Sequence, residues 1–142
     1  MSQDRGEARC IFRENDPAGR LEVWDQGNRR SLWFDDVILQ SEIDLADPGQ
    51  LPNPVNRAML APLMLNPSLD SVLLAGCGGG AIARWLHARA PAVSGDAVEL
   101  SAAVARLARD FFGFPPPCSN WRLLLGDVRH QLQVSDRRYD FI

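Results

Sequence analysis

The sequence has few of the residues from which metal sites and disulfide frameworks are built. Its three cysteines, Cys10, Cys77 and Cys118, are odd in number and widely spaced, and it has only two histidines. No CxxC pair and no cluster of cysteine with histidine occurs, so the spacing supports neither a zinc site nor a disulfide framework. Separated thiols of this kind predict a cytoplasmic protein that needs no metal.

Long apolar runs and an excess of basic charge are also missing. Because no run of 18 apolar residues occurs, neither a membrane span nor a membrane partner is expected. A net charge of −3 argues against a nucleic-acid partner, which needs a concentrated basic face. With 46% hydrophobic and 23% charged residues, the 142-residue chain has a globular composition and the length of about one domain.

The first part of the chain, residues 8–43, has the pattern of a small β-meander. Short alternating segments are separated by turn residues such as those at 15–19 and 26–28. The predicted strands are 10–12, 21–24, 31–34 and 37–40. Because a sheet this small buries too little to be stable alone, we expect residues 1–43 to pack against the later part of the chain or against a partner chain.

Residues 44–70 connect this meander to a region of different character. The segment 44–56 is rich in proline and predicts an irregular linker or lid. Residues 55–65 predict a helix with a kink at Pro62, which cannot donate a backbone hydrogen bond.

From Ser71 onward, strands alternate with helices. The predicted elements are a buried strand at 72–75, a helix at 81–87, a strand at 93–100, a helix at 102–112, a strand at 121–125 and the start of another at 139–142. This alternation predicts an α/β fold with a parallel, Rossmann-like sheet. Since such sheets normally continue with further units, we expect residues 71–142 to be the first half of a truncated or interrupted domain.

A glycine-rich loop, residues 76–80, lies between the first of these strands and its helix. Glycine permits positive φ and close backbone approach, and the following helix presents free N–H groups at a positive dipole end. Such a loop favours a ligand with a carboxylate or a phosphate. The same glycines would also serve a plain strand-to-helix turn.

Two acids follow the next strands of the predicted sheet. Glu99 ends the second strand, roughly 20 residues past the loop, and Asp127 follows the third. Because the carboxyl ends of parallel strands share one edge, these acids and the loop together predict a nucleoside site.

The loop fits two ligand classes. The pattern Gly76-x-Gly78-x-x-Ala81 matches a dinucleotide fingerprint, and Gly76-x-Gly78-x-Gly80 matches a loop for S-adenosylmethionine-type thioethers. From these residues alone, three hypotheses stay open: an adenosyl-dependent transferase, a nicotinamide-dependent oxidoreductase and a non-catalytic binding or dimerisation module.

The predicted meander is followed in order by five segments, 39–42, 72–80, 98–100, 126–128 and 139–142. This order resembles the spermidine synthase (polyamine aminopropyltransferase) family, in its bacterial spermidine-synthase-like branch. The resemblance implies a β domain followed by a Rossmann-like domain of S-adenosylmethionine-dependent methyltransferase type. It also implies a transferase of polyamine biosynthesis, which moves an aminopropyl group from decarboxylated S-adenosylmethionine to a polyamine or another amine. A homodimer is expected.

The resemblance also implies roles for particular residues. Gln40 would contact the nucleoside cosubstrate, Glu99 would hold the ribose, and Asp127 with Val128 would border the adenine. The cofactor-binding residues predicted in all are Gln40, Gly76, Gly78, Gly80, Glu99, Leu100, Asp127 and Val128.

Three departures from the family pattern bear on the reaction. Gly79 stands where the family loop has an aspartate, residues 55–59 lack the aromatic and acidic residues of the family's diamine motif, and Ile142 precedes the position of its catalytic aspartate. No catalytic residue is therefore assigned, and no turnover is expected from these 142 residues alone. The alternative is a methyltransferase-like use of intact S-adenosylmethionine, since a loop without the acid suits a ligand that keeps its carboxylate.

Overall fold

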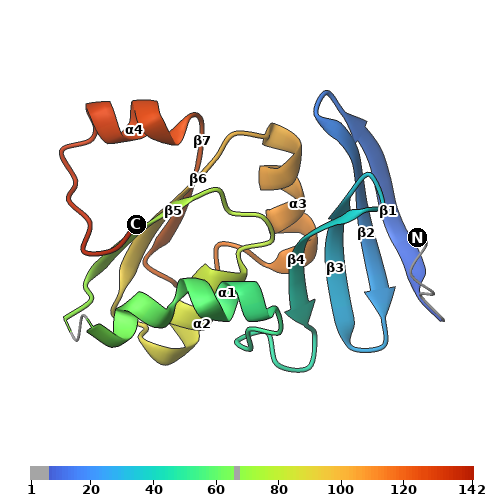
Figure 1. Ribbon diagram of the computed structural model, residues 1–142, viewed down its shortest axis with the longest axis horizontal. Coiled ribbons are helices and arrows are strands. Elements are labelled where there is room, and N and C mark those ends of the chain that lie inside the picture. The colour runs from blue at the N-terminus through green and yellow to red at the C-terminus, as the bar shows by residue number, and fades with distance from the viewer. Residues whose placement is uncertain (1–6, 66–67) are drawn as a thin grey trace.

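Two β-sheets, with one helix between them, organise the chain (Figure 1). The computed structural model describes residues 7–65 and 68–142. The parts of the predicted segments 1–43 and 44–70 that fall on residues 1–6 and 66–67 lie outside this description.

The first sheet is a four-stranded antiparallel meander in the order β1-β2-β3-β4. Its strands are β1 (Arg9–Asp16), β2 (Gly19–Gln26), β3 (Arg29–Phe34) and β4 (Ile38–Asp44). The predicted meander is confirmed, although β4 runs four residues beyond its predicted end at Gln40. Asp44 has low strand propensity and falls in the segment predicted to be irregular, but pairing with β3 extends the strand as far as Asp44↔Arg29.

Helix α3 (Ala102–Phe112) covers the inner face of this meander. Leu21, Val23 and Leu32 are fully buried there, against Leu107 and Phe112 of the helix. The helix begins as predicted, because Ser101 Oγ accepts the backbone N–H of Val104 at 3.1 Å. This packing answers the expectation that the meander needs a second layer to be stable.

The second sheet is parallel, in the order β5-β6-β7, as the alternation of elements predicts. Its strands are β5 (Ser71–Ala75), β6 (Ser94–Glu99) and β7 (Trp121–Leu125). Helices α2 (Ala81–Arg89) and α4 (Val128–Val134) lie on opposite sides of it (Figure 1). Both faces of the sheet thus carry helices, as in a doubly wound fold.

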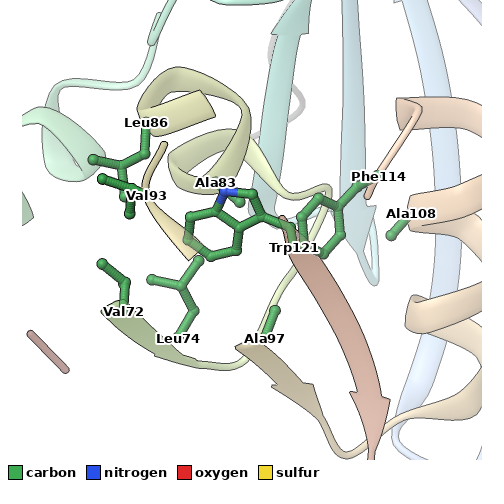
Figure 2. Close-up of a cluster of buried hydrophobic side chains, with 9 residues drawn as sticks. All are labelled: Val72, Leu74, Ala83, Leu86, Val93, Ala97, Ala108, Phe114 and Trp121. Carbon is green, nitrogen blue, oxygen red and sulfur yellow. The ribbon is translucent and has the colours of Figure 1, made fainter. Parts of the chain in front are cut away.

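Trp121 lies at the centre of the core between α2 and the parallel sheet. Figure 2 shows its indole ring next to Ala83 of α2 and to the ring of Phe114, with Leu74 and Ala97 on the strands below. The two rings meet edge to face, with centroids 6.4 Å apart. This cluster fixes α2, and with it the start of the helix that follows the glycine loop.

The predicted helix at 55–65 is wrong in its continuity. The α-helix α1 (Pro54–Met59) stops early, and a 3₁₀ helix, η1 (Ala61–Leu65), follows it. Pro62 has no N–H for an α-helical bond, and the Leu63 N–H instead donates to the Leu60 carbonyl at 3.0 Å, which is the 3₁₀ spacing. A change of helix type replaces the expected kink.

The predicted fourth strand is present only as one parallel bridge, between Val72 and Phe141. The Leu73 N–H donates to the Phe141 carbonyl at 2.9 Å, and the Asp140 N–H donates to the Ser71 carbonyl at 2.9 Å. Since Phe141 lies on the side of β5 away from β6, the chain reverses its strand order next to β5. In open α/β sheets, ligands bind at such a reversal.

Candidate functional site: a cleft over the glycine loop

A bulge in β4 presents Gln40 to the parallel sheet. Pairing with β3 skips this residue, since Trp33 pairs with Leu39 and Leu32 pairs with Ser41. A bulge of this kind releases one residue from the ladder and redirects its side chain. Gln40 is exposed and lines a cleft against the glycine loop.

The glycine loop is held by close contacts that leave no space for side chains at its far end. A Cβ at Gly79 would lie 2.7 Å from Ser41 Oγ and 2.9 Å from Phe112 Cδ1. Gly80 has φ 74° and faces the ring of Phe114. The start of the loop does have space for a side chain, because a Cβ at Gly76 would meet nothing within 4 Å. The loop is therefore packed on one side and open toward the cleft on the other.

Glu99 joins the end of β6 to this loop. Its carboxylate accepts the backbone N–H of Cys77 at 3.0 Å through Oε2 and that of Ser101 at 3.0 Å through Oε1. Two backbone donors therefore fix its orientation, and the carboxylate oxygens keep further lone pairs for a ligand hydroxyl. Glu99 lines the cleft, as its predicted role requires.

Cys77 also lines the cleft, but its thiol is not a nucleophile at neutral pH. Burial raises the pKa of the Cys77 thiol well above its usual range, and the negative charge of Glu99 raises it further. The thiolate is the reactive form of cysteine, so this protonated sulfur contributes packing.

The cleft has a volume of about 1000 Å³ and is open to solvent. Such a volume is enough for a nucleoside with a side arm. Its walls are formed by the bulge of β4, the ends of β5 and β6, the glycine loop with the start of α2, α1 with η1, and the last two residues of the chain. The lining residues are Gln40, Ser41, Asn56, Met59, Leu60, Pro62, Leu73, Leu74, Ala75, Gly76, Cys77, Gly78, Ala81, Ile82, Glu99, Phe141 and Ile142.

Four of the eight predicted site residues meet in this cleft, namely Gln40, Gly76, Gly78 and Glu99. The other four lie outside its lining. Gly80 is the N-cap of α2 and is buried, and Leu100 is 75% exposed just past β6. Val128 is the first residue of α4. For these residues and for Asp127 a binding role stays a prediction.

Asp127 caps helix α4. Its Oδ1 accepts the Arg129 backbone N–H at 2.8 Å, and its carboxylate pairs with the Arg129 side chain. The hydrogen bond from this guanidinium lowers the pKa of Asp127 to about 2. The carboxylate is therefore ionised and engaged in holding the start of α4.

Sequence reasoning missed most of the cleft's apolar wall. Met59, Leu60 and Pro62 come from the end of α1, its C-cap and η1, a stretch for which the sequence predicts a helix but none of the eight cofactor-binding residues. No local pattern indicates that this stretch folds over the glycine loop, because its position depends on tertiary packing such as that of Leu60 with Leu51 and Ala81. The last two residues reach the cleft through the strand order, which local patterns do not reveal.

Over residues 7–65 and 68–142, no group of three or more histidine, cysteine or acidic side chains is arranged to hold a metal ion. In the same residues, no helix combines the length and the apolar character that a membrane crossing requires.

The sequence is similar to curated polyamine aminopropyltransferases. It is 36% identical over 95 residues to the one from Chromobacterium violaceum, covering 67% of this chain and 36% of that protein. It is 29% identical over 121 residues to the one from Neisseria meningitidis serogroup A, covering 84% of this chain and 46% of that protein. No protein-family model matches the sequence. The chain thus spans less than half the length of these relatives.

The fold is similar to solved spermidine synthases. The match with the spermidine synthase from Thermotoga maritima covers 94% of this chain and 46% of that protein's chain, with a TM-score of 0.70 and 17% identity. The match with a probable spermidine synthase from Corynebacterium glutamicum covers 87% of this chain and 47% of that protein's chain, with a TM-score of 0.73 and 20% identity.

These neighbours define the class of fold. It is a Rossmann-like sheet of S-adenosylmethionine-dependent methyltransferase type, preceded by an antiparallel N-terminal sheet. Within that class, the sequence relatives and the fold neighbours together support a spermidine-synthase-like family for this chain.

Proposed function

We propose that the chain carries the nucleoside half of a spermidine-synthase-like site, which binds decarboxylated S-adenosylmethionine for aminopropyl transfer to a polyamine. The observation that carries this proposal is the meeting of Gln40, the loop glycines and Glu99 in one cleft. Support also comes from the polyamine aminopropyltransferases to which the sequence is similar.

The chemistry asks mainly for alignment of two reactants. An amine nitrogen attacks the carbon next to a sulfonium, a C–N bond forms, the C–S bond breaks and a neutral thioether leaves. In this arrangement Glu99 would accept hydrogen bonds from the ribose, while Gln40 would contact the nucleoside from the wall that β4 contributes. The acceptor amine must arrive unprotonated, and no residue of this chain is assigned as its base.

A second candidate has its own supporting observation. Glu99 is the one carboxylate among the lining residues of the described cleft, and it already accepts two backbone N–H groups. A cationic aminopropyl arm would need a carboxylate to pair with. An alternative use of the same cleft is therefore to bind intact S-adenosylmethionine in a methyltransferase-like protein.

Calorimetric titration of the 142-residue chain tests both candidates. The ligands are decarboxylated S-adenosylmethionine, S-adenosylmethionine, methylthioadenosine and NAD. Binding of methylthioadenosine together with a preference for the decarboxylated cosubstrate supports aminopropyl transfer, while a preference for S-adenosylmethionine supports the second candidate. Binding of none of the adenosyl thioethers would refute both, and binding of NAD alone would return the dinucleotide hypothesis.

The expected homodimer and cytoplasmic location stay predictions. Sedimentation of the chain tests the first. A strict monomer that binds methylthioadenosine would count against dimerisation and also against a purely non-catalytic association module.

A further inference from the structure

Arg84 lies buried behind the glycine loop, and no carboxylate within the described part of the chain pairs with it. It belongs to α2 and is 5% exposed, and Ala83 and Leu86 of the same helix are also buried. Its Nη1 donates to the Gly79 carbonyl and, at 3.0 Å, to the Phe112 carbonyl. Its Nε and Nη2 are buried without a hydrogen-bond partner over residues 7–65 and 68–142.

This position is costly for a cation. A buried guanidinium loses its hydration, and two carbonyl oxygens replace only part of it. Burial lowers the pKa of Arg84 to about 10, so the group remains charged at neutral pH. An apolar side chain of similar length would fill the same space without this cost, which points to a use for the two hydrogen bonds.

The two carbonyls identify that use, because they belong to different elements. Gly79 is the part of the loop that is wedged between Ser41 and Phe112. Phe112 is the last residue of α3, where helix carbonyls lack intrahelical partners and attract a cation. One nitrogen of Arg84 therefore ties the loop to the end of α3, while Glu99 holds Cys77 at the other end of the loop.

We propose that Arg84 is a positioning residue for the glycine loop: it holds Gly79 in place so that residues 76–78 keep their open face toward the nucleoside cleft. The inference deepens the proposed function, on which its ligand-binding part rests. Arg84 is not among the residues that line the cleft, so it acts through the backbone of the loop.

The test compares Arg84→Met and Arg84→Lys with Arg89→Met as a matched control. Arg89 lies in the same helix and also donates to a backbone carbonyl, that of Gly49 at 2.7 Å, but it is exposed and lies outside the cleft lining. Two quantities are measured on folded protein: amide hydrogen exchange of Cys77 to Gly80, and affinity for methylthioadenosine, a neutral probe.

In Arg84→Met we expect the loop amides to exchange about tenfold faster and methylthioadenosine to bind about tenfold more weakly. Arg84→Lys, whose ammonium can donate to the same carbonyls, recovers part of both effects, and Arg89→Met changes neither. A merely structural arginine would lower the stability of the whole chain while leaving loop exchange and affinity unchanged. That result in a folded Arg84→Met would overturn the proposal.

If Arg84→Met does not fold, Arg84→Gln takes its place and the same outcomes apply. If the unaltered chain binds no adenosyl thioether, the proposed function fails, but the exchange measurement still decides the role of Arg84. Faster exchange confined to the loop would support it, and unchanged exchange would refute it.

Discussion

The carboxylate of Glu99 accepts the backbone N–H of Cys77 across a distance of 3.0 Å, which joins the end of one parallel strand to the loop that follows its neighbour. The same carboxylate accepts the Ser101 N–H at the start of α3. Glu99 therefore has a structural task in addition to any contact with a ribose, and the two tasks are tested by separate measurements of stability and of binding.

Glu99→Gln keeps the shape of the side chain but replaces one acceptor oxygen with a donor. One backbone N–H then loses its partner, and we expect the free energy of unfolding to fall by about 1–2 kcal/mol in urea titrations. Affinity for methylthioadenosine should fall about tenfold by calorimetry. Asp110→Asn, on the exposed side of α3, removes the same charge away from the cleft and should change neither. Unchanged binding in Glu99→Gln would exclude a ribose contact.

Gln40→Ala tests the wall contributed by the N-terminal sheet. Because Gln40 is exposed and skipped by the strand pairing, its loss should change the free energy of unfolding by no more than about 0.5 kcal/mol. Affinity for methylthioadenosine should fall about three- to tenfold, as expected for the loss of one or two hydrogen bonds. Gln133→Ala on the exposed side of α4 is the matched control. Equal affinities of the two variants would remove Gln40 from the site.

Gly79→Ala tests the packing of the loop. The added Cβ would lie 2.7 Å from Ser41 Oγ and 2.9 Å from Phe112 Cδ1, so we expect a loss of about 1–3 kcal/mol in the free energy of unfolding. Ser41→Gly removes the nearer obstacle. The double variant should therefore lose less unfolding free energy than the sum of the two single losses. Strict additivity of these losses in urea unfolding would show that Ser41 is not the obstacle.

Asp96 fixes the segment that supplies the last wall of the cleft. Its fully buried carboxylate accepts Arg122 Nε at 2.7 Å, Arg137 Nη1 at 3.1 Å and the Tyr139 hydroxyl at 2.7 Å. Asp96→Asn leaves the two guanidinium groups without their anion, and we expect a loss of about 2 kcal/mol. Amide exchange of Leu73 and Asp140, which bridge β5 to this segment, should quicken. Tyr139→Phe, which removes one hydrogen bond, should cost about half as much.

The same carboxylate makes stability depend on pH. Burial raises the pKa of Asp96, but hydrogen bonds from Arg122 and Tyr139 and the charge of Arg137 outweigh it, and the pKa lies below its usual value in the folded chain. The stabilisation is therefore complete above the unfolded-state pKa and is lost as the pH falls through the folded-state value. Between about pH 5 and about pH 3, unfolding free energies of the unaltered chain should fall more steeply than those of Asp96→Asn. Parallel slopes would contradict this role.

The alternation of strands and helices could be predicted from the sequence because each element carries its own signal. Ser101 as a cap and the apolar face of α3 are local features, and the structure bears both out. The predicted helix at 55–65 is wrong because the balance between α-helical and 3₁₀ bonds around Pro62, such as the bond from the Leu63 N–H to the Leu60 carbonyl, depends on geometry rather than on composition. The bulge at Gln40 likewise has no local signal, since it arises from pairing with β3.

The cleft itself could be predicted only in part. The glycines and Glu99 follow buried strands, so the carboxyl edge of the sheet could be inferred as their meeting point. Three other features could not be predicted, because they depend on contacts between residues far apart in the chain. They are the wall formed by α1 and η1, the ion cluster of Asp96 and the burial of Arg84. Asp127 differs from these, because its place in the sequence predicts a binding role while its carboxylate caps helix α4 in the structure.

The most direct test of the central claim is a chemical-shift titration of the ¹⁵N-labelled chain with methylthioadenosine. The account predicts saturable shifts at the amides of Gln40, Gly76, Cys77, Gly78 and Glu99, which line the cleft, and no change in the outer strand β1. No saturable shift at the glycine loop, or shifts confined to surfaces away from the cleft, would contradict it.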